Sequence, residues 1–231
     1  METIVQAKRV LEIFKEMSRI PRESGNEKGI SDYIVNFAKN LGLEVHQDEI
    51  FNVVIKKAAS PGYENRPSII LQGHIDMVCV KDHDSNHDFS KDPIANIIEG
   101  DWMHADHTTL GADNGMGAAM MLALLEDENQ QHGPMQLLFT TNEETGMDGA
   151  MALTADHLTG TRLLNLDTEV EGDFLVSCSG GSNIDLSFDI AREANSSKAY
   201  KLSISGLKGG HSGVEIDKQR ANAIKLAARL L

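Results

Sequence analysis

The sequence has few cysteines and no long uninterrupted apolar run. Cys79 and Cys178 both lie in apolar, strand-like runs, which fits buried, reduced thiols in a reducing compartment better than a disulfide-based scaffold. No segment approaches the ~18 consecutive apolar residues of a membrane span. Residues 1–20 mix Lys and Glu with their apolar residues, unlike a signal peptide. These absences predict a soluble cytoplasmic protein without a membrane partner.

Basic residues are also scarce. The chain has 21 Lys and Arg against 35 Asp and Glu, for a net charge of −14. Because no basic stripe is available to neutralise phosphates, nucleic acid is excluded as a partner. With 231 residues, 41% of them hydrophobic, the chain can bury a full core and form one large domain or one and a half.

Helical and strand-like patterns alternate along the first 181 residues, which predicts an open α/β sheet. Polar residues follow the strands at their carboxyl ends, where such sheets place their sites. Strands are expected over 43–48, 52–55, 68–78, 134–141 and 162–167, with a further strand pair within 94–104. Helices are expected over 5–20, 24–41, 116–125 and 150–157, with 24–27 as polar capping residues.

The pattern changes near residue 182. Residues 184–190 and 201–206 alternate apolar with polar side chains, as strands with one wet face do, and 221–231 is helical. We therefore predict a domain at 1–181 and the start of a smaller α+β domain at 182–231. Two strands and a helix are too little for a stable sheet layer, so this second domain looks unfinished.

The central stretch, 68–78, is an apolar run that ends in Gly73 and presents His74 and Asp76. Side chains two apart on a strand emerge on the same side, so these two would lie together at its end. Such a pair suits a metal ligand with its orienting carboxylate. A core histidine bonded to a local aspartate explains this stretch equally well.

Carboxylates at the other strand ends favour the metal. One imidazole with several carboxylates suits a borderline-hard divalent ion, Zn²⁺ above all, with Co²⁺ or Mn²⁺ as substitutes. The set exceeds the three or four ligands of one zinc and so points to two ions. Each member taken singly is better explained as a loop residue or helix cap. The set comprises His74, Asp76, Asp113, Glu143, Glu144 and Asp167.

Four motifs, in order and spacing, resemble those of the dinuclear zinc exopeptidases, the family of carboxypeptidase G, tripeptidase T and acetylornithine deacetylase. Their details are most similar to the aminoacyl-histidine (Xaa-His) dipeptidase branch. The motifs are Gly73-His74-Ile75-Asp76-Met77-Val78, Gly111-Ala112-Asp113-Asn114-Gly115, Thr141-Asn142-Glu143-Glu144-Thr145-Gly146 and Asn165-Leu166-Asp167, supported by Glu169 to Gly172 and Gly206 to Gly213.

The resemblance implies a three-layer α/β/α catalytic domain followed by a lid domain. Some members of the family dimerise through this lid, so the resemblance also implies a homodimer, with a second copy of the chain as partner. It also implies a role for each matching residue. His74 and Asp167 would bind the first zinc, Asp113 would bridge both ions, Glu144 would bind the second, and Asp76 would orient His74. Glu143 would be the general base, and His211 would help to bind substrate.

The implied reaction is hydrolysis of small dipeptides, Xaa-His and β-alanyl-histidine among them. A deacylase or aminotripeptidase of the same family is an alternative. In this family the chain returns after the lid to complete the sheet and to supply a last His to the second zinc. That half would be missing here, so the second ion would lack a ligand, and a non-catalytic metal-binding fragment is a further alternative.

Overall fold

The computed structural model describes residues 5–168, 170, 172–178, 180, 182, 184–211 and 215–231. They form two compact units that divide between residues 174 and 175. Each unit is described by itself. The domain boundary at residue 181 stays a prediction.

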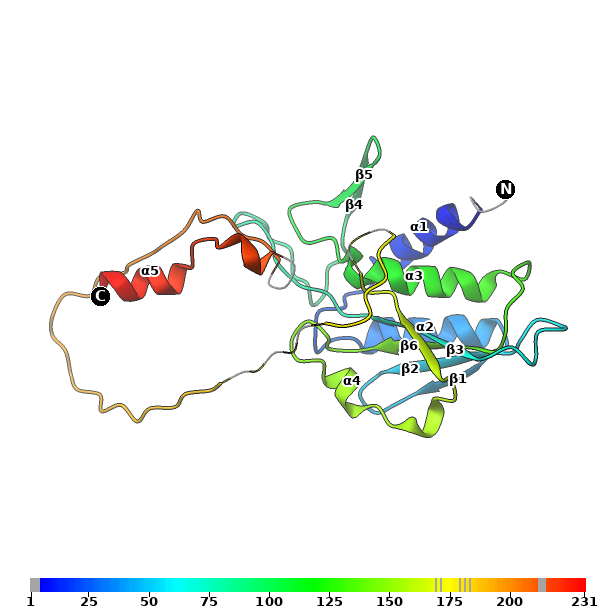
Figure 1. Ribbon diagram of the computed structural model, residues 1–231. Helices are drawn as coiled ribbons and strands as arrows, with labels where there is room; N and C mark the ends of the chain where they lie inside the picture. Colours follow the sequence, from blue (N-terminus) through cyan, green and yellow to red (C-terminus); the bar gives the residue numbers. More distant parts are fainter. Residues whose placement is uncertain are drawn as a thin grey trace. The chain divides into compact units, whose positions relative to one another are not determined.

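The first unit is built on a five-stranded mixed sheet with the strand order β1–β2–β6–β3–β7 (Figure 1). Strand β3 pairs in parallel with β6 and β7, whereas β2 pairs antiparallel with β1 and β6. The strands are β1 (Glu44–Gln47), β2 (Val53–Lys57), β3 (Ile69–His74), β6 (Met135–Thr140) and β7 (Arg162–Asn165). The carboxyl ends of the three parallel strands therefore lie at one edge of the sheet.

Helices cover both faces of this sheet, as the predicted three-layer α/β/α arrangement requires (Figure 1). Three long helices, α1 (Val5–Met17), α2 (Lys28–Asn40) and α3 (Ala112–Glu126), lie on one face. The short α4 (Asp148–Ala152) and the 3₁₀ turn η1 (Ala155–His157) cover the other. The sequence prediction of the α/β class is confirmed.

The main hydrophobic core lies between the three long helices and the sheet. Phe14, Ile34 and Leu122 are fully buried there against Leu137 and Phe139 of β6. A smaller cluster on the other face contains Val54, Ile70 and Leu138, with Leu153 and Leu158 packed against it. All six residues of β6 are buried, as expected of a central strand with helices on both faces.

Helix α3 begins earlier than the pattern predicts. Its first turn starts at Ala112, but Asp113 and Asn114 have non-helical backbone angles, so the regular helix starts near the predicted Met116. The preceding Gly111 has φ of 72°, a left-handed conformation that glycine adopts without a steric penalty. This bend directs Asp113 out of the helical path.

A separate antiparallel hairpin, β4 (Asn96–Glu99) and β5 (Trp102–Ala105), extends from the first unit (Figure 1). It confirms the strand pair expected within 94–104. His104 lies in β5, whereas His107 follows the strand in a left-handed turn with φ of 55°.

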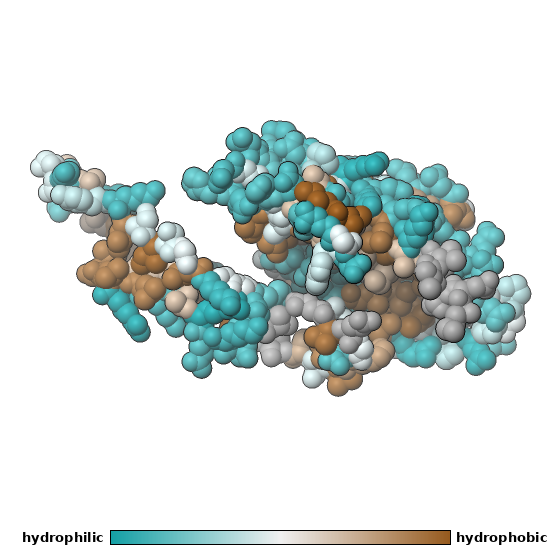
Figure 2. Space-filling model, turned by 90° about the horizontal axis from the view of Figure 1, so that it is seen from above, coloured by the Kyte–Doolittle hydropathy of each residue, from teal (hydrophilic) through white to brown (hydrophobic). Residues whose placement is uncertain are grey.

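The second unit contains the 3₁₀ turn η2 (Ile216–Lys218) and helix α5 (Ala223–Leu230). The helix agrees with the prediction, but the strands expected over 184–190 and 201–206 are wrong. The described residues of these ranges are irregular, and all except the half-buried Ile204 are exposed. A strand needs a partner strand to satisfy its backbone hydrogen bonds and to bury its apolar face, and no other segment of the described residues pairs with these ranges. Hydrophobic surface is accordingly open to solvent on this unit (Figure 2), including Ile184, Leu186, Phe188 and Ile224.

Within the described residues, every helix is too short or too polar to cross a membrane.

Candidate metal centre

The parallel strands bring their polar ends together. His74 is the last residue of β3 and lies opposite Thr140, the last residue of β6. Glu143 and Glu144 therefore follow β6 at the same edge, and Asp167 follows β7. Parallel pairing causes this convergence, because all three strands run toward the same edge.

His74 is the centre of the cluster. Its Nε2 lies 3.0 Å from Oδ1 of Asp113, 3.8 Å from Oδ1 of Asp167 and 4.0 Å from Oε2 of Glu143. Two groups of three residues could each hold an ion, namely His74 with Asp113 and Asp167, and His74 with Glu143 and Glu144. The donors are one imidazole and carboxylates, which suit a zinc-like divalent ion. The residues present therefore fit a metal, and both groups share the same imidazole.

Asp76 is fully buried and accepts hydrogen bonds on both carboxylate oxygens. Oδ1 lies 3.1 Å from Nδ1 of His74 and accepts the backbone N–H of Glu143, also at 3.1 Å. Oδ2 accepts the hydroxyl of Ser24 at 2.7 Å and the N–H of Glu144 at 3.2 Å. One carboxylate thus orients the imidazole and fixes the turn that carries both glutamates.

These contacts shift the ionisation of the pair in opposite directions. Burial lowers the pKa of His74, but hydrogen bonds to Asp113 and Asp76 outweigh it and raise the pKa to about 10. Burial would raise the pKa of Asp76, but the bonds from His74, Ser24 and the Glu143 amide lower it to about 2. Without metal, the pair is therefore an imidazolium and a carboxylate at neutral pH.

The carboxylates facing His74 repel one another. Burial and the neighbouring Asp113 raise the pKa of Asp167 to about 7. Burial and Asp113 also raise the pKa of Glu144. Carboxylates gathered this closely around one imidazole favour either a proton or a cation between them.

A segment that the sequence analysis assigned to helix capping contributes to the site. The residue before α2 is Glu27, which makes no side-chain cap; its Oε1 accepts the N–H of Asn142 at 2.9 Å. Ser24 bonds Asp76 instead of the helix. Arg22, 2% exposed, donates to backbone carbonyls of the site loops, and burial lowers its pKa to about 10. Periodicity carries no signal for such long-range bonds.

His211 lies in the second unit and is exposed; its backbone N–H donates to Glu215 at 3.0 Å. Its neighbours Ser212 and Gly213, and Glu169 and Glu171 of the supporting motif, lie outside the described residues. The structure therefore brings together His74, Asp76, Asp113, Glu143, Glu144 and Asp167, all in the first unit. The role of His211 stays a prediction.

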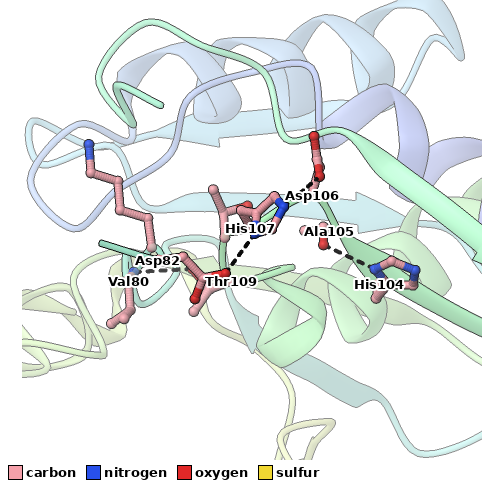
Figure 3. Close-up of a pocket in the computed structure, with 9 residues that line it drawn as sticks. Val80, Asp82, His104, Ala105, Asp106, His107 and Thr109 are labelled. Atoms are coloured by element: carbon pink, nitrogen blue, oxygen red, sulfur yellow. Dashed lines mark hydrogen bonds and ion pairs between the residues drawn. The ribbon is translucent and has the colours of Figure 1, made fainter. Parts of the chain in front are cut away.

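Two cavities of the first unit are lined in part by ionisable side chains. One, of about 190 Å³, is lined by Glu143 and Asp167 together with the apolar Leu138, Met147 and Leu153. The other, of about 490 Å³, is lined by 80–82 and 104–109 and contains none of the predicted site residues (Figure 3). There Nδ1 of His107 lies 2.7 Å from Asp82, and hydrogen bonding and charge from Asp82, with Asp106, raise the pKa of His107.

Comparison with known proteins identifies the class. The sequence pattern of peptidase family M20/M25/M40 matches residues 70–223. This range includes His74, the candidate carboxylate ligands and His211. The chain therefore belongs to this family of peptidases.

Individual relatives are dipeptidases and tripeptidases by name. The chain is 46% identical over 222 residues to the cytosol non-specific dipeptidase of Escherichia coli. This alignment covers 95% of the present chain and 46% of the relative. The crystal structure of aminoacylhistidine dipeptidase from Vibrio alginolyticus matches with a TM-score of 0.72 and 41% identity, over 96% of this chain and 46% of that one. A tripeptidase from Staphylococcus aureus matches with a TM-score of 0.60 and 27% identity, over 71% and 44%. The chain spans about half the length of these relatives.

Proposed function

We propose that the protein is a metal-dependent dipeptidase, or the site-bearing half of one, whose substrates include Xaa-His dipeptides such as β-alanyl-histidine. The observation that carries this proposal is His74 at the centre of carboxylates from three further loops, in a chain of a peptidase family. Zn²⁺ fits the donors best, with Co²⁺ or Mn²⁺ as substitutes. A cytoplasmic location agrees with the name of the Escherichia coli relative.

The bound metal would supply Lewis-acid activation of the peptide carbonyl and of the attacking water. His74, Asp113 and Asp167 would form one binding group, and Glu144 would contribute to the second. Asp76 holds the His74 ring by its Nδ1, which leaves Nε2 facing Asp113, where it would serve as the ligand of the metal. Both groups share one imidazole, so we expect one tightly held ion in the described residues and a second that is short of a nitrogen ligand.

Glu143 would take the proton from the attacking water and later deliver it to the leaving amine. Two observations support a role of Glu143 as general base and not as a purely structural residue. Its backbone N–H is fixed by Asp76, and its side chain lines the cavity of about 190 Å³ beside Asp167. A cavity of this size suits one amino-acid side chain rather than a long peptide.

A substrate panel tests the proposed reaction. We expect hydrolysis of Xaa-His and other dipeptides in the presence of Zn²⁺, Mn²⁺ or Co²⁺, little of tripeptides and none of N-acyl amino acids. The likeness to a tripeptidase makes an aminotripeptidase the second candidate, which tripeptide turnover above dipeptide turnover would favour. Zinc bound at one ion or fewer per chain with no turnover would instead support a non-catalytic metal-binding module.

Metal binding should depend on pH. The raised pKa of His74 means that the metal-free protein holds a proton on the ring at pH 7, and this proton must leave when the ring binds metal. Asp167, with its pKa raised to about 7, is partly protonated at pH 7 and releases a further fraction of a proton when it binds metal. We therefore expect Zn²⁺ binding at pH 7 to release between about one and two protons, and affinity to rise about tenfold per pH unit between pH 7 and 9.

Titration calorimetry in buffers of different ionisation enthalpy measures the protons, and competition with a chromophoric chelator measures affinity. His107→Ala is the matched control, because the pKa of His107 is also raised but its partner is Asp82, outside the centre. The Zn²⁺ affinity of the His107→Ala control should rise with pH as steeply as that of the wild type. An affinity independent of pH would contradict a binding role for His74.

A further inference from the structure

We propose that residues 22–27, here called the bracing segment, position the metal ligands and thereby set the metal affinity of the centre. This proposal rests on the proposed metal-dependent function. The bracing segment follows helix α1 and precedes α2, yet its side chains reach three of the four loops that carry the candidate ligands.

Arg22 joins two of these loops. Its Nη1 donates to the carbonyl oxygens of Ile75 and Asp76, each at 3.1 Å, at the end of β3. Its Nη2 donates to the carbonyl oxygen of Gly111 at 2.5 Å, two residues before Asp113. The loop of His74 and the loop of Asp113 are therefore held by one planar guanidinium, which lysine cannot replace in geometry.

The start of α3 is shaped around this guanidinium. A Cβ atom at Gly115 would lie 2.7 Å from Nη2 of Arg22 and 2.9 Å from the Phe14 ring. At Gly111 a Cβ would lie 2.5 Å from the same Nη2. Glycine at both positions therefore leaves space for the Arg22 guanidinium, as expected if this side chain holds the start of α3 in place.

Ser24 and Glu27 complete the bracing. The Ser24 hydroxyl donates to Oδ2 of Asp76 at 2.7 Å, beside the His74 pair. Glu27, 4% exposed, accepts the N–H of Asn142 at 2.9 Å, next to Glu143. The bracing segment thus holds the orienting carboxylate and the glutamate turn together. The outer partners of metal ligands typically contribute about 10- to 100-fold to metal affinity.

Ser24→Ala tests the proposal with the smallest structural change, because Ser24 is half-buried and only its hydroxyl is removed. We expect the Kd for Zn²⁺, measured by chelator competition, to weaken by about tenfold. The visible spectrum of bound Co²⁺ should change, and Ser24→Thr, which keeps the hydroxyl, should restore both. Ser18→Ala is the matched control: Ser18 is buried, but its hydroxyl donates to the carbonyl of Phe14 at the end of α1 and not to the centre. The Kd of this variant for Zn²⁺ should equal that of the wild type.

Arg22→Lys is the second variant, and we expect it to weaken Zn²⁺ binding more than Ser24→Ala does. The thermal midpoint of each metal-free variant is measured in parallel. If Ser24→Ala and Arg22→Lys fold and bind Zn²⁺ as the wild type does, the positioning role is overturned while the proposed function stands. If the wild type binds neither Zn²⁺ nor Co²⁺, the proposed function fails and this inference with it.

Discussion

Replacing Glu143 by glutamine is expected to lower kcat for dipeptide hydrolysis by about 10²–10⁴, the contribution typical of a general base. The amide keeps the size of the side chain and leaves the backbone bond from Glu143 to Asp76 in place. It cannot accept the proton of the attacking water. We therefore expect a loss in kcat rather than a loss of folding, measured by steady-state kinetics with a dipeptide that the wild type hydrolyses.

Zinc content per chain, determined in the same samples, separates the base from a ligand. A variant that keeps its metal and loses turnover has lost proton transfer. Glu49→Gln is the matched control, because Glu49 is exposed on the turn after β1 and should leave kcat unchanged. Hydrolysis by Glu143→Gln at the rate of the wild type would remove Glu143 from the mechanism.

Replacing Asp76 by alanine is expected to destabilise the metal-free protein by about 3–5 kcal/mol, the cost of removing one partner of a buried ion pair. The change also strips His74, Ser24 and two backbone amides of their acceptor. Urea unfolding in the presence of a chelator measures the free energy. We further expect the Kd for Zn²⁺ of the folded fraction to weaken by about 10- to 100-fold, because His74 loses the carboxylate that orients its ring.

Asp156→Ala serves as the control for this variant. Asp156 is exposed in η1 and accepts only a local bond, from Thr154 at 3.2 Å, among the bonds described for it. Its removal should change neither stability nor zinc binding. An Asp76→Ala protein with the stability and zinc affinity of the wild type would show that the four hydrogen bonds to this carboxylate contribute little.

Local patterns were sufficient for most elements of the first unit, although α3 begins earlier than predicted and the helix expected over 150–157 is divided into α4 and η1. The apolar runs at β3 and β6 and the helical spacing of α1 and α2 each encode their own periodicity, which short-range sterics determine. The convergence of His74, the glutamate pair and Asp167 also follows from sequence, once the strands are taken as parallel. The same local patterning was misleading at 184–190, because alternation makes a strand only where a partner accepts its hydrogen bonds.

The bracing segment illustrates what local patterns omit. Ser24 and Glu27 have the composition of a helix cap, and capping was the prediction. In the folded chain their partners are Asp76 and Asn142, more than 50 residues away in sequence. Arg22 also lies in a polar stretch of the sequence, yet in the folded chain it is 2% exposed. Long-range hydrogen bonds leave no periodic trace in the sequence.

The sequence by itself thus determined the α/β class, the candidate ligands and the family resemblance, because each of these depends on short motifs and on the period of a strand or helix. Only the tertiary structure decided how the candidates are held. It made Asp76 the common acceptor for the imidazole and the glutamate turn. It also placed the buried Arg22 within hydrogen-bonding distance of two loops that carry candidate ligands. The physical reason is that a buried polar group takes whichever partner the packed fold brings within reach, and that partner is set by the whole chain.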